Sequence, residues 1–293
     1  MKLMVLAGTE DGRKLALKFQ ERGHEVLVST LTEYGAEIAE GQGLKARSGA
    51  LEEAEFKATL KEHRIEVLID ATHPFAQNIR SLAQRISREG EIPYHRWERP
   101  QGEYPEDPLI HFIRDIDAAA SLASQLGKRI FLSTGSRNLK SWMSLREFRE
   151  REIFVRVLPT TQVLKQCEEV RIKPYQIIAM QGPFTQKFNE ALWEQLKIDV
   201  VITKESGSIG GTEEKVQACL ELKIPVIILD RPGARGVEAT ALKSKETTKE
   251  DSQDFVEASK GIVGSCSGLK SRLGLKRFNL ELEDFVRKVE ENS

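Results

Sequence analysis

Short apolar runs alternate with amphipathic stretches over the first third of the chain. The apolar runs are residues 3–6, 26–28, 44–46, 67–69 and 93–95, and the helical stretches between them are 13–22, 33–39, 51–63 and 75–88. Apolar runs of this length, each followed by a segment with helical spacing, are typical of βα units around a parallel sheet. The pattern predicts a Rossmann-like, cofactor-binding domain over residues 1–98.

A second alternation begins after an interruption. Residues 99–108 contain prolines and acidic side chains without periodicity, as is common in a connection between two lobes. Six further apolar runs follow, at 109–113, 129–133, 153–157, 177–180, 200–203 and 226–229. They predict a second Rossmann-like domain over residues 109–232, so the expected fold class is α/β with two mainly parallel sheets.

The last part of the chain, residues 233–293, has a different composition. Residues 243–254 are polar and lack a hydrophobic face, and residues 261–274 are rich in Gly and Ser, which predicts a mobile linker. Residues 278–289 regain apolar positions at helical intervals, which predicts a terminal helix. A chain of 293 residues exceeds the size of one growing core, in agreement with more than one domain.

The composition limits the classes of partner. With 40% hydrophobic and 30% charged residues and a net charge of −1, the chain is typical of a soluble globular protein and not of one that binds nucleic acid. No long apolar segment or leader is present, so we expect no membrane association and a cytoplasmic location. Cys167, Cys219 and Cys266 lack any metal-ligand spacing, so we expect reduced thiols and no metal site.

Polar loops follow five of the apolar runs, at residues 70–76, 96–100, 134–138, 181–184 and 203–207. Because ligands of open α/β sheets bind outside the carboxyl ends of the strands, these loops predict one shared site. Basic residues lie in or beside them: Arg96, Arg99, Arg137, Arg156, Lys187 and Lys204. Several such groups suit a ligand with many acid groups, although any single one is by default a solvated surface charge.

The turn after the first run is a glycine-poor relative of the dinucleotide fingerprint. Gly8 permits close approach of a phosphate, and Thr9 and the N-terminus of the following helix can donate hydrogen bonds to it. A tight turn without any ligand is an equal alternative for these residues. At the end of the second run, Ser29 and Thr30 stand where an acidic residue indicates NADH and an arginine indicates NADPH. Their hydroxyls suit a ribose, a 2′-phosphate or a helix cap near Glu33, so the cofactor choice stays open.

His73 is the candidate proton donor. It follows Asp70 and Thr72 at the end of an apolar run, and imidazole changes its charge near neutral pH. A structural role is an equal alternative. Pro74 and Pro183 are each predicted to begin a helix.

Taken in order, these segments resemble the precorrin-6A reductase family of cobalamin biosynthesis, including its cobalt-precorrin-6A reductase branch. The resemblance covers residues 2–232 and rests on the turn at 7–9 and the loops at 70–76, 96–100, 134–138, 181–184 and 203–207. Ala7 departs from the family's pattern, which has a glycine there, and residues beyond Pro232 lie outside the resemblance.

The resemblance implies that a nicotinamide cofactor, NADPH or NADH, and a corrinoid precursor share a cleft between two Rossmann-like domains. The implied activity is that of an oxidoreductase acting on a CH–CH group, which reduces a ring double bond of (cobalt-)precorrin-6A to give (cobalt-)precorrin-6B. The tetrapyrrole carries acetate and propionate arms and is a polyanion, which agrees with the basic loops. Other enzymes of the pathway are implied as further partners.

Roles follow for individual residues. The residues expected to bind the cofactor are Gly8, Thr9, Asp11, Ser29, Thr30 and Thr72. The residues expected to bind the substrate are Arg96, Arg99, Ser136, Arg137, Gln181, Lys204, Ser206 and Gly207. The proton comes from His73, from water or from a substrate carboxylic acid. Two other functions fit the same residues: a non-catalytic dinucleotide-sensing module, and a nucleotide-dependent reductase of another polyanionic substrate.

Overall fold

The computed structural model describes residues 1–98, 102–207, 210–231 and 267–293, with the side chains of the last segment described from Phe278 onward. The chain divides into two compact units, residues 1–234 together with Ser293, and residues 235–292. Arg99, Cys266 and the predicted linker from 233 to 266 lie outside the described residues. None of the helices within the described ranges has the length and apolar character needed to cross a bilayer.

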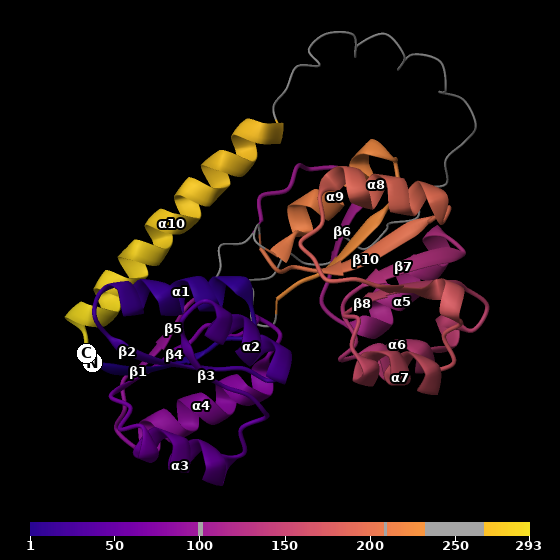
Figure 1. The fold of residues 1–293 in the computed structure, drawn as a ribbon. Helices are drawn as coiled ribbons and strands as arrows, with labels where there is room; N and C mark the ends of the chain where they lie inside the picture. Colours follow the sequence, from indigo (N-terminus) through magenta and orange to yellow (C-terminus); the bar gives the residue numbers. More distant parts are fainter. Residues whose placement is uncertain (99–101, 208–209, 232–266) are drawn as a thin grey trace, which may run out of the picture. The chain divides into compact units, whose positions relative to one another are not determined.

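The first sheet has the strand order β3-β2-β1-β4-β5, and every neighbouring pair is parallel. Its strands are β1 (Lys2–Leu6), β2 (Glu25–Ser29), β3 (Lys45–Arg47), β4 (Val67–Asp70) and β5 (Tyr94–Arg96). Its helices are α1 (Glu10–Glu21), α2 (Glu33–Gly41), α3 (Glu53–Glu62) and α4 (Gln77–Glu89). Right-handed crossovers place α3 and α4 on the face opposite to α1 (Figure 1).

The second sheet has the order β6-β11-β10-β7-β8-β9 and is also parallel throughout. Its strands are β6 (Ile110–Ile113), β7 (Arg129–Ser133), β8 (Glu152–Val157), β9 (Ile177–Ala179), β10 (Val200–Lys204) and β11 (Val226–Leu229). Its helices are α5 (Ile116–Leu126), α6 (Leu139–Ser144), η1 (Arg146–Phe148), α7 (Thr161–Glu169), η2 (Pro174–Gln176), α8 (Gln186–Gln195) and α9 (Thr212–Glu221). The predicted α/β class with two parallel sheets is confirmed.

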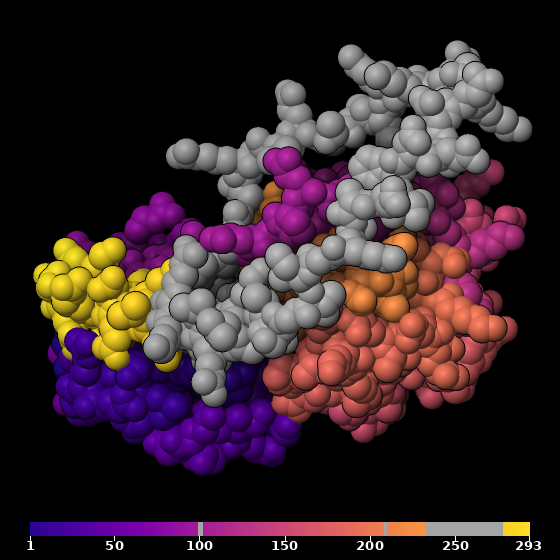
Figure 2. Space-filling view, turned by 90° about the horizontal axis from the view of Figure 1, so that it is seen from above, coloured from indigo at the N-terminus to yellow at the C-terminus, as the bar shows by residue number. Residues whose placement is uncertain are grey.

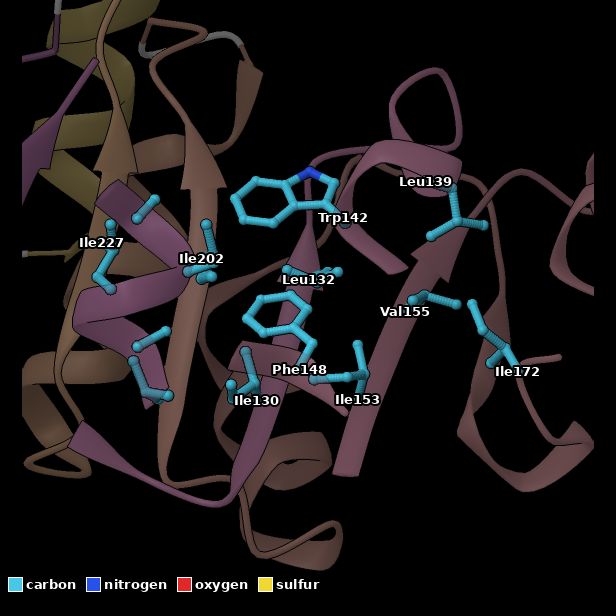
Figure 3. Packing of buried hydrophobic residues seen from close by; sticks show 14 of the residues in the cluster. Ile130, Leu132, Leu139, Trp142, Phe148, Ile153, Val155, Ile172, Ile202 and Ile227 are labelled. Carbon is cyan, nitrogen blue, oxygen red and sulfur yellow. The ribbon is translucent and has the colours of Figure 1, made fainter. Parts of the chain in front are cut away.

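Two apolar layers enclose the second sheet. On one face, side chains of β7, β8 and β10 pack against α5, α6, η1 and α7, with Trp142 stacked on Phe148 at a ring-centroid distance of 5.6 Å (Figure 3). On the other face, Trp193 of α8 and Val216 of α9 pack on Phe131 and Phe154. α8 and α9 lie side by side (Figure 1) and form the salmon and orange surface in Figure 2. This second layer is referred to below as the α8–α9 layer.

Three predicted helix starts are wrong by a few residues. α1 begins at Glu10 and not at residue 13, because Thr9 is extended and the acidic Glu10 opens the first turn. α4 begins at Gln77 and not at Pro74, because the amide of Ala76 donates to the carbonyl of His73 and closes a separate turn. α8 begins at Gln186, where the Thr185 side chain caps the amide of Phe188, so Pro183 precedes the helix.

The predicted terminal helix is confirmed, and it is longer than expected. α10 spans Ser267–Glu291, so residues 267–274, predicted as part of a linker, are helical. Four of the eight residues in this stretch are Gly or Ser, which indicated a linker, although Leu269 and Leu273 stand four residues apart, at helical spacing. Composition was therefore a misleading signal here.

Gly12 allows α1 to pack closely on the end of β1. A Cβ atom at Gly12 would lie 2.7 Å from the Cβ of Ala7 and 3.3 Å from the Cβ of Ala71. We predict that Gly12→Ala lowers the free energy of unfolding by about 1–2 kcal/mol, because overpacking costs about 1–3 kcal/mol and the gain in helix propensity is smaller. Urea denaturation followed by circular dichroism measures this effect.

Gly41→Ala is the matched control, since Gly41 is also helical and a Cβ atom added there would meet no heavy atom within 4 Å. It is expected to leave stability unchanged or to raise it by up to about 1 kcal/mol. Equal stabilities of the two variants would contradict the close approach at Gly12.

Candidate active site

The strand order of the first sheet reverses between β1 and β4. α1 leads from β1 toward β3, whereas β4 is followed by β5 on the other side, so the loops after β1 and β4 diverge. Leu6 and Asp70 are paired in register at the ends of these two strands. The crevice at such a reversal is the usual ligand site of an open α/β sheet. The turn at residues 7–9 and the loop at 71–76 therefore flank it.

The second sheet reverses in the same way between β7 and β10. Ser133 and Thr203 are paired in register at the ends of these strands. The loop at residues 134–138 follows β7, and the loop beginning at Glu205 follows β10. Two of the predicted site loops thus flank this second reversal.

The turn after β1 has the features of a phosphate-binding site. Thr9 is the N-cap of α1, but its side chain caps no amide, and its buried Oγ1 has no hydrogen-bond partner among the described residues. A Cβ at Gly8 would point into open space. A phosphate there could accept from Oγ1 and lie at the N-terminus of α1, whose amides point toward it. Asp11, in contrast, is buried against the sheet with 1% exposure.

The end of β2 is occupied by internal hydrogen bonds. Ser29 Oγ accepts from Arg47 Nη1 at 3.0 Å, and Thr30 Oγ1 lies 2.9 Å from the carbonyl of Thr32, to which it donates. Thr32 caps α2, which confirms the capping role considered for this segment. Arg47 also pairs with Glu55, with Nη2 2.7 Å from Oε1. A cofactor ribose would meet hydroxyls that already have protein partners.

Asp70 anchors the loop after β4. It is fully buried, and its Oδ1 accepts from the amide and the hydroxyl of Thr72 at 2.9 and 2.6 Å. Its Oδ2 accepts from Tyr94 Oη and Arg96 Nη1, both at 2.6 Å. Burial raises the pKa of the Asp70 carboxyl, but the hydrogen bonds from Thr72 and Tyr94 and the charge of Arg96 outweigh it, so the pKa is lowered overall. The guanidinium of Arg96, which was predicted to bind substrate, therefore donates to Asp70.

His73 lies in a tight turn that fixes its orientation. Its Nδ1 is the acceptor for the amide of Phe75 at 3.3 Å, so the proton of the neutral ring is assigned to Nε2. Arg80 Nη2 donates to the carbonyl of Pro74 at 2.7 Å and holds the same turn. The imidazole is partly exposed.

Phe75 brings the loop after β4 to the second sheet. Its ring packs against the core beneath α5, α6 and α7, and Lys204 Nζ lies 5.2 Å from the ring centroid. Burial, followed by the charge of Arg137, lowers the pKa of Lys204 to about 8. The structure therefore brings together Lys204, Arg137 and the segment that carries His73.

The remaining predicted residues differ in position. Ser206 is buried, and its Oγ bonds the carbonyl of Gly210 at 3.1 Å and Thr212 Oγ1 at 2.8 Å. The amide of Gly207 donates to Glu205 at 2.8 Å, so both residues shape the loop from within. Ser136 holds the start of α6 through its carbonyl, and Gln181 is exposed and accepts from Tyr34 Oη at 2.6 Å.

The sequence indicated Arg156 only as one of several basic residues beside the loops, and it gave no indication of Lys215. Both are buried in the α8–α9 layer, with exposures of 6% and 9%, and neither forms an ion pair within the described part of the chain. Arg156 donates to Asn189 Oδ1 at 2.6 Å and to Ser133 Oγ at 2.9 Å, and its guanidinium lies over the ring of Phe184. The available signal was a charge inside the apolar run at 153–157.

Burial lowers the pKa of Arg156 to about 10. Burial, followed by the charge of Arg156, lowers the pKa of Lys215 to about 8. Lys215 Nζ has one long hydrogen bond, 3.4 Å, to the carbonyl of Gly210. Buried cations without a carboxylate are costly, so an anionic ligand close to them would be stabilised.

Residues 2–255 match the family described as Precorrin-6x reductase CbiJ/CobK. The chain belongs to this family. Among its relatives, a cobalt-precorrin-6A reductase of Salmonella typhimurium is 36% identical over 231 residues, which cover 78% of this chain and 87% of the relative. A cobalt-precorrin-6A reductase of Methanocaldococcus jannaschii is 35% identical over 79% of this chain and 91% of its own length.

A precorrin-6A reductase of Rhodococcus erythropolis is 30% identical over 79% of this chain and 89% of the relative. The solved structure of CobK precorrin-6A reductase matches this fold with a TM-score of 0.66 at 24% identity, and the match covers 80% of this chain and 90% of that one. The expected family and fold are thereby confirmed, and the chain is a member of a family of reductases.

We predict that Asp70→Asn lowers the free energy of unfolding by about 3 kcal/mol at pH 7, because it leaves the mostly buried Arg96 without its charge partner. The Asp70 carboxyl has a lowered pKa in the fold, so its contribution is complete above the ordinary value of about 4 and is lost as the pH falls through the lowered one. Urea unfolding should therefore show a constant difference from pH 5 to 8, in the range of about 3 kcal/mol, that closes only in stronger acid.

Glu98→Gln is the control for this test. Glu98 is the other carboxylate near Arg96, at 3.2 Å, but its side chain is 73% exposed, so its loss should cost less than about 1 kcal/mol. Equal unfolding midpoints for Asp70→Asn and the unmodified protein at pH 7 would show that the buried network does not hold the loop.

Proposed function

We propose that this chain reduces a ring double bond of precorrin-6A, or of its cobalt form, with a nicotinamide cofactor. The observation that carries the proposal is the chemistry at the two reversals of strand order. One is flanked by a helix N-terminus with an unpaired buried hydroxyl, and the other by Lys204 and Arg137, which form no ion pair among the described residues. A dinucleotide and a polyacidic tetrapyrrole are a pair of ligands that match these two surfaces.

The first sheet is proposed to hold the cofactor, which supplies a hydride when bound. Thr9 Oγ1 and the first amides of α1 would receive its pyrophosphate, and Gly8 leaves room for it. The end of β2 favours neither NADPH nor NADH. No carboxylate stands at Ser29 or Thr30 to bind a ribose diol, and the nearby Arg47 already pairs with Glu55.

The second sheet is proposed to hold the tetrapyrrole. Lys204 and Arg137 flank the reversal of strand order, and Arg156 and Lys215 add two buried charges in the α8–α9 layer. Guanidinium and ammonium groups that lack protein carboxylates are free to bind acetate and propionate arms. The chain's main task is to align the two ligands and exclude water, since hydride transfer needs little covalent help.

His73 is proposed as the proton donor to the carbon next to the one that receives the hydride. Because Nδ1 accepts a backbone hydrogen bond, the proton to be delivered is the one on Nε2. Water and a substrate carboxylic acid are the other sources of this proton. A His73→Ala variant that retains full single-turnover reduction would remove His73 from the reaction.

The function is tested by anaerobic incubation of the whole protein with precorrin-6A and with cobalt-precorrin-6A, each with NADPH and NADH in parallel. The expected result is a loss of absorbance at the nicotinamide band that depends on the tetrapyrrole, with formation of the reduced product. A dinucleotide sensor would bind the cofactor without oxidising it. A reductase of another substrate would leave both tetrapyrroles unchanged, and either result would overturn the proposal.

Lys204 provides a test of the substrate site through pH. The pKa of Lys204 is about 8, so its charge is present below that pH and lost above it. We predict that Lys204→Met lowers kcat/KM for the tetrapyrrole about 10- to 100-fold below pH 8, since a charged hydrogen bond contributes about 1.5–3 kcal/mol. The two profiles should converge above pH 8, and Lys204→Arg should keep its activity to higher pH.

Lys165→Met, on the exposed side of α7, controls for the loss of a positive charge elsewhere. Lys204 is not among the groups that shift the pKa of Lys215, so Lys215 is a common background in this comparison. A Lys204→Met variant with an unchanged kcat/KM at every pH would exclude Lys204 from the substrate site.

A further inference from the structure

Glu205 is a buried carboxylate to which the proposed reaction gives no direct role. It follows β10 directly, and only 2% of its surface is exposed. Its Oε1 accepts from the amide of Gly207 at 2.8 Å, from the amide of Gly102 at 3.3 Å and from Arg231 Nη2 at 3.3 Å. Its Oε2 accepts from the hydroxyl of Tyr104. Four donors thus converge on one carboxylate, three of them on Oε1.

These donors come from three separate segments. The loop that follows β10 contributes Gly207. The connection between the two sheets contributes Gly102 and Tyr104, and the segment after β11 contributes Arg231. Tyr104 is itself held by packing in the α8–α9 layer and by the ring of Phe112 at 5.7 Å. Burial, followed by the charge of Glu205, raises the pKa of the Tyr104 hydroxyl, which therefore remains a donor.

The backbone on either side of Glu205 is also fixed. Its amide donates to the carbonyl of Leu229 at 2.8 Å, and Gly207 has a positive φ of 75°, a conformation that glycine adopts without strain. Lys204, one residue before Glu205, turns its ammonium toward Phe75. Lys204 is the last residue of β10, so the segment that begins directly after it is held chiefly by the contacts of the Glu205 carboxylate.

We propose that Glu205 is a positioning residue of the reductase: it ties the connection between the sheets to the loop that begins directly after Lys204, and so sets the affinity for the tetrapyrrole. The expected change in KM for the tetrapyrrole rests on the proposed function, whereas the hydrogen bonds of Glu205 do not. The tie itself consists of the hydrogen bonds that the Gly102 amide and the Tyr104 hydroxyl donate to this buried carboxylate. Glu205 touches neither ligand in this scheme, because its own donors occupy it.

Two variants test the tie in full-length protein. Tyr104→Phe removes one donor and leaves the loop's own amide bond intact, whereas Glu205→Gln keeps the shape and removes the charge. We expect each to raise KM for the tetrapyrrole about tenfold with KM for the nicotinamide cofactor unchanged, and to accelerate hydrogen exchange of the amides at 203–207. The double variant should show less than the product of the two effects, because both act through the same contact.

Glu152→Gln is the matched control. It removes the carboxylate that pairs with Arg129 at the amino ends of β7 and β8, away from the loops after β7 and β10. A residue that only stabilises the fold would lower the active fraction, and with it kcat, without changing either KM. Unchanged KM for the tetrapyrrole and unchanged exchange at 203–207 in Tyr104→Phe and Glu205→Gln would overturn the proposal.

Failure of the proposed function is distinguishable from failure of this inference. If the unmodified protein reduces neither tetrapyrrole, the reductase proposal falls, and the exchange measurement still decides whether Glu205 holds the loop. Faster exchange at 203–207 in both variants, with exchange in β6 and β7 unchanged, would support the tie. Uniformly faster exchange across the second sheet would show that Glu205 acts on global stability and would overturn the positioning role.

Discussion

The reversal of strand order in each parallel sheet is the constraint on which the site depends. Strands β1 and β4 in the first sheet, and β7 and β10 in the second, are hydrogen-bonded neighbours whose following helices depart in opposite directions. The divergence leaves backbone amides and loop side chains accessible where other loops would close over them. Four of the segments with anion-binding residues flank these two positions.

Charge compensation distinguishes the two sheets. In the first, the buried Asp70 is surrounded by donors and faces Arg96, so its loop is rigid and its charge is satisfied. In the second, Arg156 and Lys215 are buried and hydrogen-bond only to neutral groups of the described residues, although the charges of Glu214 and Glu205 also act on Lys215. Desolvation of an unpaired cation is unfavourable, and an acidic ligand offsets it. The buried cations of the second sheet therefore favour the binding of an anionic ligand.

Hydrophobic periodicity was sufficient for the elements and for the fold class. All eleven strands lie at or within a residue or two of the predicted runs, because buried parallel strands are nearly continuous apolar sequence bounded by loops. Helix starts were less predictable. At Thr9, Ala76 and Thr185 the start depends on which backbone amides find a cap, and the prolines at 74 and 183 gave a misleading signal.

By itself, the sequence determined two parallel α/β sheets, the loops at their carboxyl edges and the resemblance to a reductase family. Only the tertiary structure decided which of the loop residues are available to a ligand. Thr9 keeps an unpaired hydroxyl, whereas Ser206 and Gly207 are bonded within their own loop. The pairing of Arg96 with Asp70 and the contact of Lys204 with Phe75 join residues far apart in the chain. Such pairings depend on strand order and register, which residue spacing along one chain does not encode.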